Sequence, residues 1–333
     1  MSDNVILDVK NLCFSYYKKP LCLKDVSFSI EKGKNYLLCG VAESGKTTFL
    51  KVISGFQEGY FGKITYNGKE LKHVLDYEKN FSFLPSEPIF FNSKSIRKNI
   101  DFQTKTLGRE NLTEKELNDL LLLFNIEKSE KTKVKKLSLL EKRKLALARS
   151  YIKNPSIIFV DDPFVNLSDE ECNKLNKCLE LFFDSKNISV FMTTGSESYL
   201  KNKNLIESLE LKNIFFLSLS NVYKYKNIEA MIEDAKTAEV MQFANNRKKY
   251  VGYISVKNGE YFYVEENVRF VKFDKKYNKI FDKLKIQENG DEDVWLFAKN
   301  DVDLWKLNDI DFNLLLEKNE ILIFLTLDLS RLL

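Results

Sequence analysis

The feature that most constrains the fold is a stretch in which an apolar strand, a glycine-bounded loop and a helix start follow one another. It covers residues 36–50 and reads YLLCGVAESGKTTFL. Within it, Gly40, Gly45, Lys46 and Thr47 fit the spacing G-x-x-x-x-G-K-[ST]. The glycines let backbone N–H groups surround a phosphate, the helix N-terminus adds positive potential, the lysine reaches the β- and γ-phosphates, and the threonine binds Mg²⁺. The stretch therefore predicts a nucleoside triphosphate site.

We expect consecutive loop residues to bind the phosphates. These are Gly40, Val41, Ala42, Glu43, Ser44, Gly45, Lys46, Thr47 and Thr48. The predicted metal residues are Thr47 and Asp161. Asp161 follows the continuous apolar run 157–160, and nucleotides bind at the carboxyl ends of parallel strands, so we expect it either to bind Mg²⁺ directly or to hold a group that does. A glycine turn that happens to precede a helix is the simpler alternative, but it leaves the Lys-Thr-Thr run unexplained.

Composition limits the class of protein. With 333 residues, 44% hydrophobic and 30% charged, the chain is long enough for two ordered domains. The net charge of +4, from 52 basic and 48 acidic residues, is too small to argue for a nucleic-acid partner. Five cysteines without metal-ligand spacing fit a reducing cytosol, and the single histidine, His73, is expected on the surface. No signal peptide or membrane-spanning run is apparent, so we expect a cytoplasmic protein.

Periodicity and turn residues predict a mixed α/β chain with several short strands after residue 245. The predicted elements are an antiparallel sheet over residues 5–30, a helix from the loop to Gly55, a hairpin at Asn67-Gly68, a strand at 81–84, a capped helix after Thr113, a helix at 140–153, and strands at 157–160 and 188–193. Phe90 and Phe91 are expected in an exposed loop after the 81–84 strand. The alternative is that both rings fill the local core.

The order of these parts, over residues 5–234, resembles the ATP-binding subunit of ABC transporters. SYY, containing Tyr16, is similar to the aromatic that stacks on adenine, and LPSEPIFF, LSLLEKRKLALAR, IIFVDDP, VNLS and FMTTGS stand where the family has its Q-loop, signature helix, Walker B strand, D-loop and switch histidine. The resemblance implies the P-loop ABC ATPase fold, which is a mostly parallel sheet with an antiparallel β subdomain and a helical subdomain. It also implies ATP and Mg²⁺ as cofactors, transmembrane permease partners, and a place on the inner face of the cell membrane.

The tail gives a narrower resemblance. IEAMIEDAKTAEVMQFA and the short strands after it resemble the linker and OB-like (TOBE) barrel of MalK/UgpC-type carbohydrate importers. This implies a nucleotide-binding domain at 1–235 and a regulatory β-barrel domain at 236–333. Ordinary core packing is the alternative for these strands, and for Trp295 and Trp305.

Several positions depart from the family pattern. Ser86 replaces the Q-loop glutamine, Asp162 the catalytic glutamate, Gly195 the switch histidine and Ser168 the D-loop aspartate; in the signature, Ser138 is kept, but Leu139, Leu140 and Glu141 replace Gly-Gly-Gln. Asp162 is one methylene too short, so it forfeits part of the ~10²–10⁴-fold that a general base supplies. The two leucines are expected to place bulky groups where a phosphate should lie, and Glu141 to add like charge.

In this family two nucleotide-binding domains pair head to tail, so the resemblance implies that a homodimer would carry every defect twice. We therefore expect MgATP binding with weak hydrolysis, in a heterodimer with a consensus ATP-binding partner. Phe90 and Phe91 would dock the coupling helix of a transmembrane partner. One alternative is a regulatory, non-transport ABC protein that binds ATP without turnover. The other alternative is a P-loop kinase. It is disfavoured, because a kinase needs no signature-like helix before the strand that ends at Asp161.

Overall fold

The computed structural model forms two compact units, Met1–Met231 and Ile232–Leu333. The described residues are 4–19, 21–41, 43–75, 78–195, 213–218, 220–226, 230–231, 243, 248–257, 260–265, 269–277, 292–298, 313 and 321–325. Ala42, Trp305 and most of the predicted linker at 228–244 lie outside them. None of the helices in the described part of the chain is both long and apolar enough to cross a bilayer.

An antiparallel sheet opens the first unit, as the alternation of residues 5–30 predicted. Its order is β2-β1-β4-β5, with β1 at Val5–Ser15, β2 at Leu21–Glu31, β4 at Phe61–Tyr66 and β5 at Lys69–Glu70. The predicted hairpin is confirmed: Asn67 and Gly68 both have positive φ, 47° and 80°, as the two central residues of a tight hairpin turn require.

A six-stranded sheet of order β10-β9-β3-β8-β7-β6 forms the centre of the first unit. All its pairings are parallel except that between β9 and β10. The strands are β3 at Asn35–Cys39, β6 at Phe81–Leu84, β7 at Ile157–Val160, β8 at Ser189–Thr194, β9 at Asn213–Ser218 and β10 at Asn221–Tyr225. All four residues of β7 are buried, which confirms the prediction made from its continuous apolar run.

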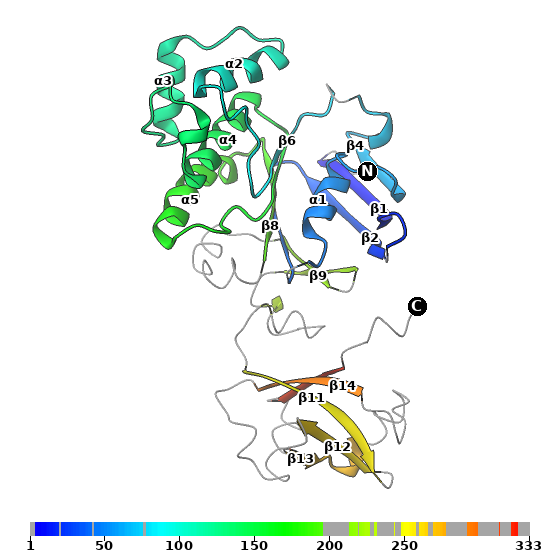
Figure 1. Ribbon diagram of the computed structural model, residues 1–333. Helices are drawn as coiled ribbons and strands as arrows, with labels where there is room; N and C mark the ends of the chain where they lie inside the picture. Colours follow the sequence, from blue (N-terminus) through cyan, green and yellow to red (C-terminus); the bar gives the residue numbers. More distant parts are fainter. Residues whose placement is uncertain are drawn as a thin grey trace. The chain divides into compact units, whose positions relative to one another are not determined.

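The helices lie on two sides of these central strands. They are α1 at Lys46–Ile53, α2 at Ile96–Thr106, α3 at Glu114–Leu123, α4 at Leu139–Lys153 and α5 at Asp169–Phe183. Figure 1 shows α2 to α5 gathered on one side, and α1 with the β1–β2–β4 sheet on the other. The fold of the first unit is therefore the predicted one, with a mostly parallel sheet, an antiparallel β part and a helical part.

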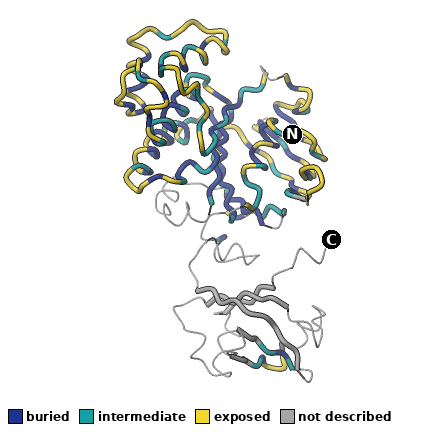
Figure 2. Tube along the Cα trace, viewed as in Figure 1, coloured by how far each residue is buried: buried dark blue, intermediate teal, exposed yellow. Residues whose placement is uncertain are grey.

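Aromatic rings fix α1 against both sheets. Phe49 on α1, Phe28 on β2 and Phe191 on β8 pack together with centroids 5.5–5.8 Å apart. Phe49 and Phe191 are almost completely inaccessible to solvent, and Figure 2 shows buried residues running through the central strands. Because a close-packed interior resists displacement, the helix that follows the glycine-rich loop rests on a rigid base.

The second unit contains a five-stranded antiparallel sheet of order β13-β12-β11-β14-β15. Its strands are β11 at Lys248–Lys257, β12 at Glu260–Glu265, β13 at Arg269–Lys272, β14 at Glu292–Ala298 and β15 at Ile321–Leu325. The short strands predicted for the tail are confirmed. Closure into a barrel requires the edge strands β13 and β15 to pair, and no such pairing occurs among the described residues.

Candidate functional site

The loop between β3 and α1 has a backbone that two glycines make possible. Gly45, at the N-cap of α1, has φ +99°, a conformation that side chains with a Cβ rarely adopt. A Cβ on Gly40 would lie 2.6 Å from Ser44 Oγ and 2.9 Å from the carbonyl oxygen of Leu217. The predicted loop residues lie together around this turn, apart from Ala42, which falls outside the described residues.

The Lys46 amine is held inside the loop. Its Nζ donates to the carbonyl oxygens of Gly40 at 2.9 Å and Val41 at 2.7 Å. Burial lowers the pKa of Lys46, and the carboxylates of Asp162 and Asp161 partly offset that effect. The loop therefore holds a largely desolvated cation beside the α1 N-terminus, where an anion is stabilised by both the amine and the helix.

The two predicted Mg²⁺ ligands are in direct contact. Thr47 Oγ1 donates to Asp161 Oδ2 at 2.7 Å, and Asp161 is 5% exposed. The other carboxylate oxygen, Oδ1, accepts from Thr193 Oγ1 at 2.8 Å. Mg²⁺ prefers oxygen ligands and is commonly held by one or two side chains together with substrate phosphates and water. The hydroxyl of Thr47 and the carboxylate of Asp161 fit that requirement.

Thr193 is a site residue that the sequence reasoning missed. Besides contacting Asp161, its Oγ1 accepts from the backbone N–H of Asp162 at 3.0 Å. The parallel register pairs Val160 of β7 with Met192 of β8, so Thr193 lies level with Asp161 at the same sheet edge. The available signal was the polar pair Thr193-Thr194, which follows the apolar residues of this strand.

Asp162 and Gly195, which the sequence places at the predicted base and switch positions, contact each other. Gly195 N–H donates to Asp162 Oδ2 at 3.0 Å, and Asp162 itself has φ +39°. A Cβ on Gly195 would lie 3.1 Å from the same oxygen. The Asp162 carboxylate is thus turned towards the backbone of the switch position, and a side chain there would crowd it.

A buried arginine joins the Q-loop position to two other segments. Arg143 on α4 is 1% exposed, and its Nε and Nη2 donate to the carbonyl oxygen of Ser86 at 3.0 and 2.8 Å. Its Nη1 donates to the carbonyl oxygen of Val165 at 2.7 Å. The sequence reasoning missed Arg143, although its spacing from Leu140 and Leu147 places it on the same face of the helix as those apolar residues.

At the predicted signature position, Ser138 and Glu141 hydrogen-bond to each other and cap the N-terminus of α4. Ser138 Oγ accepts from Glu141 N–H at 3.2 Å, and Ser138 N–H donates to Glu141 Oε2 at 2.8 Å, which is a complete capping box. The expectation for Leu140 needs correction, because its side chain is 8% exposed and points into the fold. Leu139 is half-buried. Leu139 is the first residue of α4, so Leu139 and the Glu141 carboxylate both lie at this helix N-terminus.

Of the remaining predicted residues, Tyr16 lies beside the glycine-rich loop, whereas Ser168 caps a helix. The Tyr16 hydroxyl lies 3.1 Å from Thr48 Oγ1, which places the ring beside the start of α1. Ser168, at the D-loop position, caps α5 by accepting from Glu171 N–H at 3.3 Å. The expected exposure of the aromatic loop is correct for Phe91, at 51%, but wrong for Phe90, which is half-buried against Arg149.

Comparison with known proteins finds a family match over the part of the chain that carries Lys46 and Asp161. Residues 23–165 match a protein family described as "ABC transporter". Similar curated proteins include the molybdate/tungstate import ATP-binding protein WtpC of Thermococcus kodakarensis, 31% identical over 46% of this chain and 47% of the relative. The sulfate/thiosulfate import ATP-binding protein CysA of Synechocystis is 30% identical over 54% and 51% of the two chains. The chain thus spans about half the length of these relatives.

Two solved structures share the fold. One is described as the ATP-binding subunit of an ABC transporter and superposes with a TM-score of 0.58 at 21% identity, over 72% of this chain and 98% of that one. The other, cbiO1 from Clostridium perfringens, described as part of the complex cbiONQ, gives a TM-score of 0.57 at 19% identity, over 73% and 95%.

Proposed function

We propose that this chain is the ATP-binding subunit of a membrane importer, because residues 23–165 match the ABC transporter family. The observation that carries the proposal is the loop geometry, in which Lys46 lies inside the turn and Thr47 contacts Asp161 at 2.7 Å. That arrangement supplies a cation for the β- and γ-phosphates and two oxygen ligands for Mg²⁺. ATP and Mg²⁺ are the cofactors.

Hydrolysis by this chain alone is slow. The Asp162 carboxylate is one methylene shorter than glutamate and is oriented by Gly195 N–H, at 3.0 Å, so it is displaced from the position where a base would activate water. Gly195 brings no side chain to the γ-phosphate, and the short Ser86 side chain replaces the longer amide of the Q-loop. General-base catalysis requires the base within hydrogen-bond reach of the water. Bound ATP therefore persists.

The physiological form is a heterodimer with a consensus ATP-binding subunit. In a head-to-tail pair, the N-terminus of α4 would face the nucleotide held by the partner. Here Glu141 already accepts from Ser138 N–H at that N-terminus, so its carboxylate competes with an incoming phosphate and repels it. Two copies of this chain would repeat that defect at both sites, whereas a consensus partner contributes one intact signature.

The solute is proposed at the level of class. Carbohydrate import rests on the resemblance of the linker and tail strands to MalK/UgpC-type subunits. Import of an oxyanion is the second candidate, because two similar proteins are named as import proteins for molybdate/tungstate and for sulfate/thiosulfate. A regulatory, non-transport role that senses ATP without turnover is the alternative that the held Asp162 carboxylate favours.

Residues 1–235 form the nucleotide-binding domain and 236–333 a regulatory domain, which we propose to be an OB-like barrel on the strength of its five antiparallel strands. The first domain docks on permease subunits at the inner face of the membrane through the loop that carries Phe91, whose ring is 51% exposed.

Co-purification tests the proposal. The tagged chain is expressed in its own host, membranes are solubilised in mild detergent, and captured proteins are identified by mass spectrometry. We expect permease subunits and one consensus ATP-binding protein. Recovery of the chain with no membrane protein and no second ATPase, while it still binds MgATP, would remove the importer role and leave the regulatory alternative.

A further inference from the structure

Two segments of the first unit form a strongly basic surface. They are residues 92–98, which lead into the first turn of α2, and residues 128–136, which lie between α3 and α4. Together they carry eight basic residues and one acidic residue, a net charge of +7 in a chain whose total is +4. Charge concentrated in this way creates a local surface potential that attracts an anionic partner, although the total charge is small.

Backbone hydrogen bonds hold the two segments side by side, although most of α2 and all of α3 separate them in the chain. Val134 N–H donates to the carbonyl oxygen of Lys94 at 3.0 Å, and Ile96 N–H donates to that of Thr132 at 2.9 Å. The lysines of both segments therefore contribute to one surface rather than to two.

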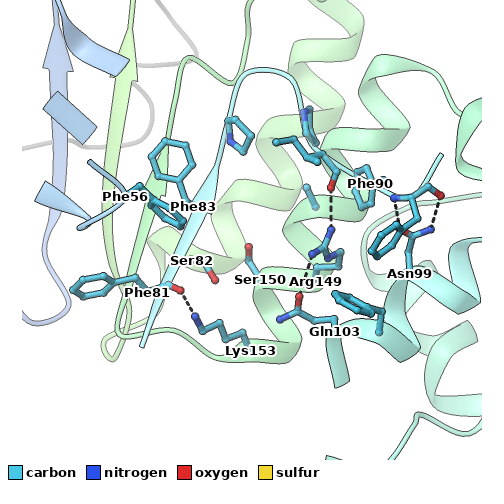
Figure 3. A pocket seen from close by; sticks show the side chains of 16 residues that line it. Phe56, Phe81, Ser82, Phe83, Phe90, Asn99, Gln103, Arg149, Ser150 and Lys153 are labelled. Carbon is cyan, nitrogen blue, oxygen red and sulfur yellow. Dashed lines mark hydrogen bonds between the residues drawn. The ribbon is translucent and has the colours of Figure 1, made fainter. Parts of the chain in front are cut away.

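A buried side chain anchors the first segment to α2. Asn99 Oδ1 accepts from Phe91 N–H at 3.0 Å, and its Nδ2 donates to the carbonyl oxygens of Phe91 and Ser95 at 3.3 and 2.9 Å. Figure 3 shows Asn99 with its hydrogen bonds to this loop. The backbone on both sides of Lys94 is thus held in place, so the spacing of the basic residues is set by the fold.

The one acidic residue of the two segments is already paired. Glu130 Oε2 accepts from Arg97 Nε at 2.8 Å and also from Arg97 Nη2, and Lys128 lies 3.7 Å from the Glu141 carboxylate. The other basic residues are exposed, and none of them forms an ion pair within the part of the chain that the structure describes. These six residues, here called the lysine patch, are Lys94, Lys98, Lys131, Lys133, Lys135 and Lys136.

The composition of the two segments distinguishes among anionic partners. Their apolar residues, Ile96 and Val134, are buried, and neither segment contains an aromatic residue. Protein interfaces have an apolar or aromatic centre and are depleted in lysine, whereas single-stranded nucleic acid is bound by stacking on aromatic rings. Arg97, whose planar fork would suit an individual phosphate, is occupied by Glu130. Exposed lysines without these features fit a diffuse layer of anionic lipid headgroups.

We propose that the lysine patch binds the anionic headgroups of a phospholipid bilayer, so that this chain contacts the lipid surface itself. The inference goes beyond the proposed function, because the contact needs no permease subunit. Each lysine close to an anionic leaflet strengthens binding about fivefold. The attraction falls off within a Debye length, about 10 Å at 0.1 M salt, so the attachment is reversible and sensitive to salt.

Flotation of the purified full-length chain with protein-free vesicles tests the proposal. The vesicles contain phosphatidylcholine alone, or phosphatidylcholine with about one third phosphatidylglycerol, which supplies the anionic headgroups. We expect binding to the anionic vesicles and none to the neutral ones. Raising NaCl from about 0.05 to 0.5 M should abolish binding, because salt screens exposed charges. MgATP binding is measured on the same samples, so failure of the proposed nucleotide site is seen separately.

Charge variants identify the residues that bind. Lys131→Gln/Lys133→Gln/Lys135→Gln should weaken partitioning into anionic vesicles about a hundredfold, and Lys94→Gln/Lys98→Gln about 25-fold. Arginine substitutions at the same three positions keep the charge and should stay within about twofold of the wild type. Urea unfolding confirms that each variant is folded.

A matched control removes the same number of charges elsewhere. Lys51→Gln/Lys177→Gln/Lys224→Gln changes exposed lysines on α1, α5 and β10, and it should stay within about threefold of the wild type. A loss in this control as large as that in the triple variant at 131, 133 and 135 would assign binding to the total charge and overturn the inference.

Other outcomes also contradict the proposal. Equal binding to neutral vesicles would exclude the headgroup charge, and full binding by Lys94→Gln/Lys98→Gln would exclude a surface shared by the two segments. Polyuridylate and polyglutamate are added as competitors at the same charge concentration as the anionic lipid. Displacement of the chain from the vesicles by polyuridylate would assign the patch to nucleic acid, and displacement by polyglutamate would assign it to an acidic protein.

Discussion

Asp161 receives hydroxyl groups from two separate elements. Thr47 on α1 donates to one carboxylate oxygen at 2.7 Å, and Thr193 on β8 donates to the other at 2.8 Å. The contacts join residues 114 and 32 positions apart. The loop itself could be predicted because its spacing is local, whereas Thr193 could not, because its role depends on the register between β7 and β8.

Thr193→Val should destabilise the site and weaken Mg²⁺-dependent binding. The substitution keeps the shape but leaves Asp161 Oδ1 and the Asp162 N–H without the Thr193 hydroxyl, at a cost of about 1–3 kcal/mol. Urea unfolding measures the stability, and ATP titrations with and without Mg²⁺ measure the site. Thr193→Ser, which keeps the hydroxyl, should remain within about 1 kcal/mol of the wild type. Equal losses in the two variants would show that the methyl group, not the hydroxyl, matters.

Restoring the base and the switch residue together should raise hydrolysis, whereas restoring the switch alone should not. A Cβ at position 195 would lie 3.1 Å from Asp162 Oδ2, so Gly195→His alone displaces the short carboxylate. Asp162→Glu with Gly195→His supplies both the longer base and the imidazole. Single-turnover hydrolysis of ATP is the measurement, and Gly195→Ala is the control for crowding without an imidazole. No gain in the double variant would assign the defect to Ser86 or to the signature.

At the scale of elements, helix-capping residues and the patterns of apolar residues predicted most of the helices and strands. The capping box at Thr113 and Glu116 is present, and β6 and β7 occupy the predicted residues. The half-burial of Phe90 was not predictable from its loop, because it depends on Arg149, 59 positions away on α4. The same limit hid the contact of Arg143 with Ser86, 57 positions away.

Arg143→Met should loosen the connection between α4 and the two loops it holds. The carbonyl oxygens of Ser86 and Val165 would lose their donors, which costs about 1–3 kcal/mol for a buried acceptor. Hydrogen exchange of segments 84–88 and 163–168 should rise more than that of β7. Arg143→Lys keeps the charge but not the planar fork, so it should show a smaller increase at both segments. A uniform increase across the whole unit would indicate global destabilisation instead.

The capping box of α4 stabilises that helix, and under the proposed function the same residues would face the nucleotide of the partner subunit. Ser138→Ala should cost about 0.5–2 kcal/mol, the usual penalty for losing such a cap. Glu141→Gln should retain most of that stability, because the amide oxygen can still accept from Ser138 N–H, and it removes the negative charge. In the reconstituted heterodimer we therefore expect Glu141→Gln to raise ATPase activity at the site formed with this helix. A decrease would mean that the carboxylate assists turnover.

At the scale of the whole molecule, the glycine-rich loop keeps the G-x-x-x-x-G-K-[ST] spacing, whereas Asp162 and Gly195 stand at the positions predicted for the base and the switch residue. The mixed sheet and the helical part of the first unit were predictable, because the sequence motifs follow one another in the order of the ABC family and each motif is tied to a known strand, loop or helix of that fold. The tail was predictable only as short strands, because alternation fixes a strand but not the closure of a sheet. The central claim that follows is binding of MgATP without efficient turnover by the isolated chain.

One experiment on the purified chain tests that claim most directly. Radiolabelled MgATP is added in excess, unbound nucleotide is removed by rapid gel filtration, and the bound nucleotide is identified after a fixed incubation. We predict about one intact ATP per chain, and loss of binding in Lys46→Ala but not in Lys51→Ala on the same helix. At about 100 times the dissociation constant, binding should stabilise the wild type by about 2.7 kcal/mol. Bound ADP formed at the rate of a consensus subunit, or no bound nucleotide at all, would contradict the account.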